Sequence, residues 1–310
     1  MYDYPVNDKN VVVFYHDSCM DGFAAAALMY TRYPLATYQP INYGRPNTMD
    51  VEGKVVFFVD FCPDTEWTSA NWEKTQRCIL LDHHKDSTDR AGHAKEHVRP
   101  GDHIGFDMAH SGAGLAWEYL YPNEPMPPMV KLVELRDLWL LTPDMRKYHE
   151  YFATFLAKGE PDVIFPPFVE ILYTQDQAGV DEITAMADIL VKARDQQVEW
   201  FMKNATWWYR GQVIRGPKGQ VDTTIAVLNC PHIFISEVAS QIMEKNPRVD
   251  LVIGTSISGK GMGFSFRSRA GSGLASHVAK KFSGGGHPDA AGGRCAGIKS
   301  YEELVKEACE

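Results

Sequence analysis

The fold is decided by Cys78-Ile79-Leu80-Leu81-Asp82-His83-His84, an apolar run that ends in one acid and two imidazoles. Two earlier runs end in a similar way, since residues 11–15 lead into His16 and residues 55–59 lead into Asp60. Short, continuous and β-branched apolar runs are typical of strands buried on both faces of a parallel sheet. Sites of such sheets form at the carboxyl ends of the strands, so we expect these polar side chains to gather there.

Helix-like stretches alternate with these strands. Residues 23–30 are rich in alanine, residues 111–121 begin at Ser111, and residues 129–141 follow a proline-rich stretch. A serine at the start of such a pattern is a typical helix cap. This alternation predicts an α/β fold whose N-terminal domain holds a mostly parallel sheet.

A long helical pattern over residues 181–208 is expected to connect this domain to a second one. A chain of 310 residues is long enough for two domains. Beyond the connector, a helix over residues 272–282 and four strand-like runs predict a smaller α/β domain. The runs cover residues 212–214, 223–228, 251–255 and 261–269. We place the catalytic domain at residues 1–195, including the start of the connector, and the C-terminal domain at residues 215–310.

The composition is that of an ordinary globular protein, with 45% hydrophobic and 23% charged residues. No apolar run approaches the roughly 18 residues that cross a membrane, and the N-terminus lacks the pattern of a signal peptide. The six cysteines are scattered without a Cys-x-x-Cys pair, which argues against a disulfide scaffold or a thiolate zinc site. We therefore expect a cytoplasmic protein with no membrane partner.

The charge is unevenly distributed. Overall, 31 basic residues stand against 40 acidic ones, a formal net charge of −9, which disfavours a protein that coats long nucleic acid. Residues 254–294, in contrast, hold six basic side chains and a single acid, Asp289. This segment predicts contact with a short anionic substrate, while the acidic remainder could hold metal.

Metal-type ligands follow each predicted strand. The candidates are His16, Cys19 and Asp21 after the first, Asp60 after the second, Asp82, His83 and His84 after the third, and Asp137 between apolar neighbours. Any one of them alone could equally cap a helix or loop. Together they indicate a cation, because clustered buried carboxylates repel one another unless a cation neutralises them. Carboxylate and imidazole ligands suit Mn²⁺, Fe²⁺ or Zn²⁺, and the excess of oxygen favours Mn²⁺ or Mg²⁺.

These motifs resemble the DHH phosphoesterase superfamily. The strand ending in Asp82-His83-His84, the upstream Asp60 and the first motif His16…Asp21-Gly22 stand in the order of its catalytic domain. The C-terminal half resembles the substrate-binding domain that accompanies it, through the segment around Arg267 and the run Gly284-Gly285-Gly286-His287. The chain is similar to the oligoribonuclease (nanoRNase-like) or exopolyphosphatase-like members.

The resemblance implies two divalent cations, foremost Mn²⁺, with Mg²⁺ or Co²⁺ as alternatives. Asp60 would bridge them. One cation would bind His16, and the other would bind Asp21, His83 and Asp137. By the same resemblance, His84 would contact the scissile phosphate and Asp82 would orient an imidazole, which leaves these two as the predicted catalytic residues.

One departure concerns Cys19, which stands where the family usually has the first acid of an Asp-x-Asp pair. Cys19 could be a thiolate ligand, although soft sulfur suits manganese poorly. It could equally be an inert small residue, with water or Asp17 completing the ligand shell. The first cation would then bind more weakly than the second or would be a different ion.

The second domain is expected to hold the substrate. Gly284, Gly285 and Gly286 lack a Cβ, so their backbone N–H groups could approach a phosphate closely. His287 and Arg267 could bind the remaining oxygens, Arg267 through two parallel hydrogen bonds. Alternatively, the glycine run is a flexible surface turn. The aromatic run 207–209 could stack bases, but its position near the end of the connector helix favours domain packing.

The resulting prediction is a phosphodiesterase that hydrolyses short oligonucleotides or linear dinucleotides to nucleoside monophosphates, using a metal-activated water. Alternative substrates within the superfamily are cyclic dinucleotides, 3′-phosphoadenosine 5′-phosphate and inorganic polyphosphate. A third hypothesis is a catalytically silent nucleotide sensor. Long nucleic acid is not expected as a partner, and the sequence leaves a homodimer possible. We expect the active site between the two domains.

Overall fold

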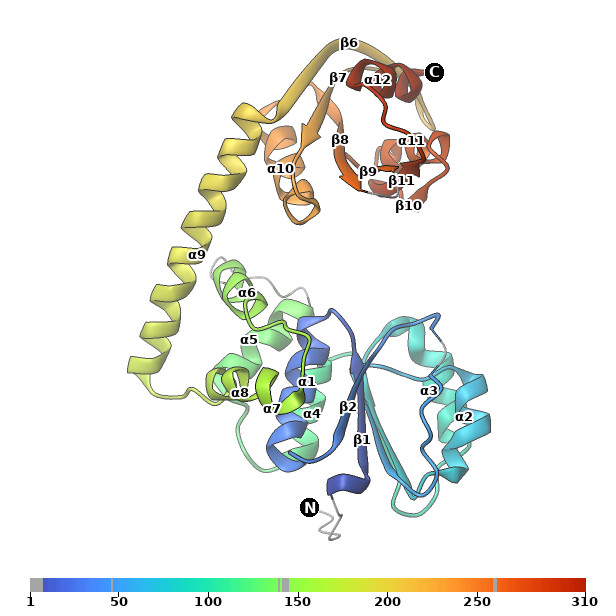
Figure 1. The fold of residues 1–310 in the computed structure, drawn as a ribbon, viewed down its shortest axis with the longest axis vertical. Helices are drawn as coiled ribbons and strands as arrows, with labels where there is room; N and C mark the ends of the chain where they lie inside the picture. Colours follow the sequence, from blue (N-terminus) through green and yellow to red (C-terminus); the bar gives the residue numbers. More distant parts are fainter. Residues whose placement is uncertain (1–7, 46, 139, 141–144, 259–260) are drawn as a thin grey trace. The chain divides into compact units, whose positions relative to one another are not determined.

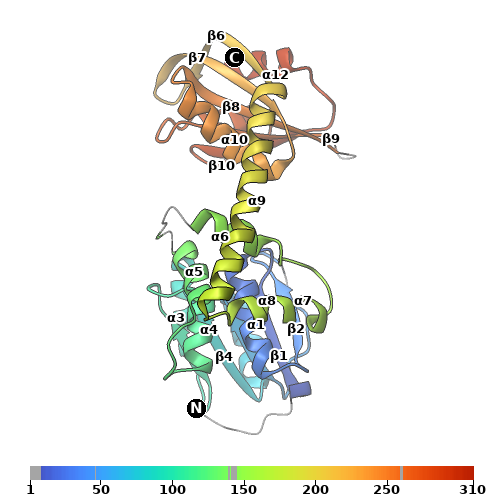
Figure 2. The ribbon, with the colours of Figure 1, turned by 90° about the vertical axis from the view of Figure 1, so that its left-hand side faces the viewer.

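The computed structural model describes residues 8–45, 47–138, 140, 145–258 and 261–310. Its chain divides into two compact units, Met1–Val191 and Lys192–Glu310. The division falls inside the helix α9 (Gln177–Asn204), which Figure 2 shows as one unbroken helix. Among the described residues, no helix combines the length and the apolar character that crossing a membrane requires.

The first unit is built on a five-stranded sheet in the order β2-β1-β3-β4-β5, with every neighbouring pair parallel. Its strands are β1 (Val11–His16), β2 (Thr37–Ile41), β3 (Val55–Val59), β4 (Arg77–Asp82) and β5 (His103–Phe106). The α/β class with a parallel N-terminal sheet is therefore confirmed. The sequence analysis missed the two edge strands, because β2 contains polar residues and Pro40, and β5 has only four residues.

Helices cover both faces of this sheet (Figure 1). The helices are α1 (Met20–Arg32), α2 (Thr65–Asn71), α3 (Thr88–Lys95), α4 (Gly112–Leu120), α5 (Pro128–Asp137), α6 (Met145–Ala153), α7 (Pro161–Ile164) and α8 (Pro166–Leu172). Alternate strand residues face two separate apolar cores, one beneath α1, α4, α5 and α8 and the other beneath α2 and α3. The four alanines 24–27 of α1 are fully buried, so this helix can lie close against the sheet. The predicted helix 129–141 ends at Asp137, and residues 139 and 141 lie outside the described residues.

The second unit holds a mixed six-stranded sheet in the order β10-β11-β9-β8-β7-β6, in which only β7 and β8 pair in parallel. Its strands are β6 (Thr206–Gly216), β7 (Gly219–Asn229), β8 (Val249–Ser258), β9 (Gly261–Ser268), β10 (Gly285–His287) and β11 (Ala290–Cys295). The helix α10 (His232–Lys245) covers one face, and α11 (Leu274–Lys281) and α12 (Tyr301–Cys309) cover the other. The smaller α/β unit is thus as expected.

The end of the connector helix was predicted wrongly. The helix stops at Asn204, and Trp207 and Trp208 belong to the edge strand β6. Aromatic and β-branched residues favour a pleated strand, and this local preference outweighs the helical pattern that leads into it. Trp207 packs against Tyr301 of α12 with ring centroids 4.9 Å apart, so this tryptophan contributes to packing within the second unit.

Candidate metal centre

The carboxyl ends of three neighbouring strands form the base of the candidate site. The registers of the pairs β1–β3 and β3–β4 bring His16, Asp60 and Asp82 to corresponding positions, each at or just beyond its strand's end. Asp60 and Asp82 are completely buried. Asp60 also has a positive φ of 55°, a conformation that a non-glycine residue adopts at a cost of roughly 1–3 kcal/mol. The fold therefore holds the Asp60 carboxylate in one strained orientation at the centre of the site.

Six of the predicted side chains form two groups of potential metal ligands. The first group is His16, Asp60 and His84, and the second is Asp21, His83 and Asp137. Within each group the ligand atoms lie within 4.8 Å of one another. Asp60 contacts both groups, because its Oδ2 lies 3.5 Å from His16 Nδ1 and its Oδ1 lies 3.2 Å from His83 Nε2. This is the arrangement that a bridging carboxylate requires.

Two buried atoms of the first group indicate where a cation fits. His16 Nδ1 and Asp60 Oδ2 are both inaccessible to water, and neither has a hydrogen-bond partner among the described residues. A buried polar atom without a partner costs about 1–3 kcal/mol. One imidazole nitrogen and one carboxylate oxygen that face each other at 3.5 Å form a donor set that suits a divalent cation. The residues present therefore fit the metal that the motifs predict.

The second group is supported by the start of α4, which is not among the predicted site residues. Asp21 is 1% exposed, and its carboxylate accepts hydrogen bonds from the backbone N–H groups of Gly112 (2.5 Å) and Ala113 (2.9 Å). A Cβ at Gly112 would lie 2.4 Å from the Cβ of Asp60. The small residues that follow Ser111 were the sequence signal for this close approach. Helix capping by Ser111 was by itself enough to explain why a helix begins here.

A second missed residue is Glu134, which is fully buried one helical turn before Asp137 on α5. Its carboxylate lies 3.0 Å from His110 Nδ1 and is paired with Lys131. Burial alone would raise the pKa of Glu134, but Lys131 and His110 outweigh burial and lower it. Glu134 therefore ties α5, which carries Asp137, to the start of α4, which holds Asp21.

The site is electrostatically strained without a cation. Burial, and next the charge of Asp60, raises the pKa of Asp21 well above its usual value. Burial likewise raises the pKa of Asp137. Burial would also raise the pKa of Asp60, but the imidazoles of His16 and His83 outweigh it and keep this pKa below its ordinary range. Burial thus disfavours the ionised forms of Asp21 and Asp137, and a nearby cation would favour them.

Asp82 orients His84. Asp82 Oδ1 lies 2.7 Å from His84 Nδ1, so that His84 Nδ1–H donates to it. This hydrogen bond raises the pKa of His84 to about 9. The imidazole is therefore positively charged at neutral pH when no metal is bound, and its Nε2–H is a second donor.

Cys19 and Asp17 lie outside both ligand groups. Cys19 precedes the first turn of α1, and burial, with the charges of Asp60 and Asp21, raises the pKa of its thiol. Asp17 Oδ2 instead contacts Lys158 and Asn42, each at 3.3 Å. Ligation of the first cation by Cys19, or by Asp17 or water in its place, therefore remains a prediction. The geometry favours neither side chain.

We expect Mn²⁺ to stabilise the protein more as pH rises from about 6.5 to 8.5. Without metal, the raised pKa of His84 means that the folded state keeps a proton that the unfolded chain, with a pKa of 6.5, releases. The stability of the metal-free protein should therefore fall as pH rises through this window. Cations displace these protons, so the Mn²⁺-induced increase in Tm should grow with pH. Differential scanning fluorimetry at matched ionic strength, with and without chelator, measures this increase in Tm. An increase that becomes smaller as pH rises would contradict the assignment of these residues to a metal site.

In the second unit, Arg267 and His287 lie in one row across the sheet, since both pair with Ala290 of β11. They therefore point to the same face. The guanidinium of Arg267 donates to the hydroxyls of Ser236 on α10 (2.9 Å) and Ser265 (3.0 Å). The predicted two-bond contact with a phosphate would thus require at least one of these hydroxyls to release the guanidinium.

Part of the predicted glycine turn is the strand β10. Its glycines differ in the space around the missing Cβ and in their backbone angles. A Cβ at Gly284 would lie 2.0 Å from the carbonyl oxygen of Gly292, and Gly286 has a φ of 142°. Gly285 has open space around its missing Cβ. Backbone packing therefore explains Gly284 and Gly286 without any ligand, and Gly285 is the position at which a binding role can be tested separately.

We expect Gly285→Ala to leave Tm unchanged, within about 0.5 kcal/mol of stability. If the run approaches substrate, this variant should raise KM by roughly tenfold, because the added methyl group blocks the close approach. Gly284→Ala should instead lower Tm, since overpacking of this kind costs about 1–3 kcal/mol. Thermal unfolding and steady-state kinetics on both variants separate the roles, and an unchanged KM for Gly285→Ala would leave the glycine run purely structural.

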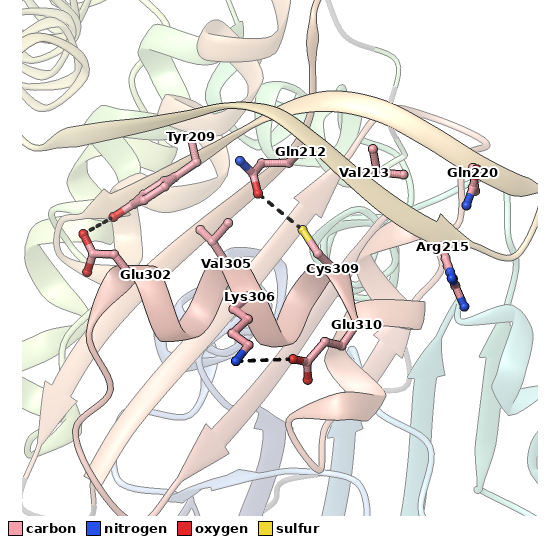
Figure 3. Close-up of a pocket in the computed structure, with 10 residues that line it drawn as sticks. All are labelled: Tyr209, Gln212, Val213, Arg215, Gln220, Glu302, Val305, Lys306, Cys309 and Glu310. Atoms are coloured by element: carbon pink, nitrogen blue, oxygen red, sulfur yellow. Dashed lines mark hydrogen bonds and ion pairs between the residues drawn. The ribbon is translucent and has the colours of Figure 1, made fainter.

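A cavity of about 710 Å³ in the second unit lies between β6 and α12 (Figure 3). Tyr209 donates a hydrogen bond to Glu302 across it, and Cys309 lies 3.8 Å from the Gln212 side chain. The predicted substrate-binding residues are not among the ten that line this cavity. It opens beside α12, whereas Arg267 is held by Ser236 of α10, on the other face of the sheet.

Comparisons with known proteins give one match within the second unit and others along the whole chain. A family model described as the DHHA1 domain matches residues 224–310. Along the whole chain, an uncharacterized protein of Acanthamoeba polyphaga mimivirus is 24% identical over 310 residues, covering 94% of this chain and 69% of that protein.

Among solved structures, the pGpG-specific phosphodiesterase PggH from Vibrio cholerae has a TM-score of 0.56 at 13% identity, with 96% of this chain and 98% of that chain covered. RecJ in complex with Mn²⁺ from Thermus thermophilus has a TM-score of 0.45 at 14% identity, covering 98% of this chain and 54% of that one. The DHHA1 match, the fold shared with PggH and the strand-end Asp82-His83-His84 motif agree with one another. Residues 224–310 thus match the DHHA1 domain, and the motifs along the chain are similar to those of the DHH phosphoesterase superfamily.

Proposed function

We propose that this protein is a metal-dependent phosphodiesterase that hydrolyses linear dinucleotides and short oligonucleotides to nucleoside monophosphates. The observation that carries the proposal is the pair of ligand groups joined by Asp60, together with the buried His16 Nδ1 and Asp60 Oδ2 that face each other in the first group. The acidic character of the chain outside residues 254–294 favours a short substrate, because a long polyanion would meet repulsion beyond that segment. One protein of the same fold is a pGpG-specific phosphodiesterase, which makes pGpG a natural first substrate to test.

Each side chain of the site has a separate task. His16 and Asp60 would hold one cation, and Asp21, His83 and Asp137 would hold the other. When bound, two such cations supply a water of lowered pKa and neutralise the oxygens of the phosphate. The first cation has fewer ligands from this chain, so we expect it to bind more weakly than the second.

His84 is assigned to the phosphate. Its Nδ1 is occupied by the buried Asp82, which fixes the ring and leaves Nε2–H to donate to a phosphate oxygen. A hydrogen-bond donor aimed at a phosphate oxygen stabilises the negative charge that grows there during hydrolysis.

The test is a substrate panel with purified protein, in which nucleotide products are separated by chromatography. The panel holds pGpG, pApA, oligonucleotides of about two to seven residues, a cyclic dinucleotide, 3′-phosphoadenosine 5′-phosphate and polyphosphate, each with Mn²⁺, Mg²⁺, Co²⁺ or chelator. We expect nucleoside monophosphates from the linear substrates and loss of turnover with chelator. The double variant Asp82→Ala/His83→Ala is the inactive control.

Two outcomes would replace this proposal by an alternative. Phosphate released from polyphosphate, with dinucleotides left intact, would identify an exopolyphosphatase. Nucleotide binding with no metal-dependent turnover of any substrate would identify a sensor in which the Cys19 departure has removed catalysis.

A further inference from the structure

A cavity of about 330 Å³ lies beside the metal centre, entirely within the first unit. Asp17 and Ser18, which line it, directly follow the candidate ligand His16 in the chain. Its other walls come from the ends of β1 and β2, from α1 and from residues 156–164. Cavities of this size suit a small ligand or part of one.

The apolar walls of the cavity are rigid. Tyr15, Phe23 and Tyr38 line it, and all three rings pack around the buried Phe165, with centroids 5.0–6.0 Å from the Phe165 ring. Tyr15 and Phe23 are only 7% and 3% exposed. Aromatic rings held in place in this way provide a preformed apolar surface for a flat, aromatic ligand.

The polar edge of the cavity combines an acceptor and a donor. Asp17 Oδ2 lies 3.3 Å from Lys158 Nζ, and the Asp17 side chain is 17% exposed whereas that of Lys158 is 78% exposed. A carboxylate only accepts hydrogen bonds, and an ammonium only donates them. Any base bound here therefore meets a strong acceptor from the cavity wall and, next to it, a mobile donor.

The backbone turns this carboxylate away from the metal ligands. Ser18 has a φ of 59°, and the backbone N–H of Asp17 donates to the carbonyl oxygen of Ile41 on β2. Consequently His16 faces Asp60, whereas its neighbour Asp17 faces Lys158. A cation at the metal centre and a base in the cavity would thus be held by the consecutive residues His16 and Asp17.

Guanine is the base that can form the most hydrogen bonds with this edge. Guanine presents two adjacent donors, N1–H and the N2 amino group, beside the acceptor O6. These correspond to Asp17 and Lys158. Adenine presents one donor, the N6 amino group, beside the acceptor N1, so it would form one hydrogen bond fewer with Asp17 and Lys158 than guanine. Pyrimidines have a single ring and would contact less of the aromatic wall.

We propose that this cavity is a base-recognition subsite that selects guanine, with Asp17 accepting from N1–H and N2–H and Lys158 donating to O6. The inference rests on the proposed function, because it assigns the base next to the scissile phosphate. Asp17 and Lys158 are specificity residues in this assignment and take no part in the chemistry.

Binding of 5′-GMP and 5′-AMP to metal-free protein in chelator, measured by calorimetry or NMR titration, tests the subsite without turnover. The ratio of the two Kd values cancels the contribution of the shared phosphate. We expect GMP to bind about 10- to 100-fold more tightly than AMP, the range of a hydrogen bond to a charged group. Asp17→Asn should remove this preference, and Lys158→Gln should reduce it.

The control is Asp188→Asn, which removes one carboxylate of another ion pair, with Lys147 at 3.5 Å, away from the cavity. This variant should keep the wild-type ratio. A merely structural role of Asp17 would weaken GMP and AMP equally and lower Tm, and that result would overturn the proposal.

Turnover separates the subsite from the proposed function. Equal kcat/KM for pGpG and pApA in the wild type, with equal Kd for GMP and AMP, would refute guanine selection while the phosphodiesterase stands. Selective, Asp17-dependent binding of GMP without cleavage of any dinucleotide would refute the phosphodiesterase while the subsite stands. A preference for pGpG that disappears in Asp17→Asn, while pApA turnover is kept, would support both.

Discussion

Asp60→Asn is expected to lower kcat/KM by at least about 10³-fold and to abolish binding of one of the two cations. Asp60 contacts both ligand groups, so its loss removes a charge that each cation needs. Metal stabilisation of the transition state is worth several kcal/mol, and every 1.4 kcal/mol corresponds to a factor of ten. Asparagine is the informative substitution because it tolerates the left-handed backbone that Asp60 adopts, with a φ of 55°.

Metal stoichiometry and steady-state kinetics with Mn²⁺ measure the effect. Asp89→Asn is the control, since it removes the same charge from an exposed position in the first turn of α3. Full activity with two cations bound at wild-type affinity in Asp60→Asn would show that Asp60 is not the bridging ligand.

Gly112→Ala is expected to damage the metal centre although it changes no potential ligand. The added Cβ would lie 2.4 Å from the Cβ of Asp60 and 2.9 Å from Asp21 Oδ2, so both carboxylates must move. It would also disturb the short hydrogen bond from the Gly112 N–H to Asp21. Displacing residues that orient ligands costs about 10- to 100-fold in metal affinity or activity, and overpacking costs about 1–3 kcal/mol of stability.

Gly92→Ala provides the matched comparison. Gly92 lies inside the helix α3 with open space around its missing Cβ, so alanine should be neutral or stabilise the helix by about 0.5–1 kcal/mol. The two variants are compared by thermal unfolding and by titration with Mn²⁺. Wild-type metal affinity in Gly112→Ala would mean that the start of α4 does not shape the site.

The strand-end motifs were predictable because their signal is local. An apolar run and the ionisable residue that terminates it are adjacent in the chain, so Asp60 and Asp82 could be placed at the ends of strands without any knowledge of their neighbours. Asp137 was selected by its apolar surroundings and by the family resemblance. The structure brings it to His83 at 3.3 Å. The catalytic and metal-binding roles of these side chains remain predictions.

The support of the site was not predictable in the same way. Gly112 and Glu134 act through contacts with residues more than twenty positions away, and each has an ordinary local explanation, a helix start and a charged helix residue. The end of the connector helix was predicted wrongly because the helical pattern continues into Trp207 and Trp208. Their pairing with the distant strand β7 makes them part of a strand instead.

The sequence by itself therefore determined the α/β class, the strand ends at which chemistry is placed and the resemblance to the family, because all three depend on short motifs and their order. Only the tertiary structure decided that His84 is the imidazole that Asp82 orients, that His84 lies with His16 and Asp60, and that Asp17 turns away from His16 toward Lys158. These relations depend on the register between strands and on backbone angles such as the positive φ of Asp60 and Ser18. Register and backbone angles emerge only when distant segments pack together, and no local pattern of residues encodes them.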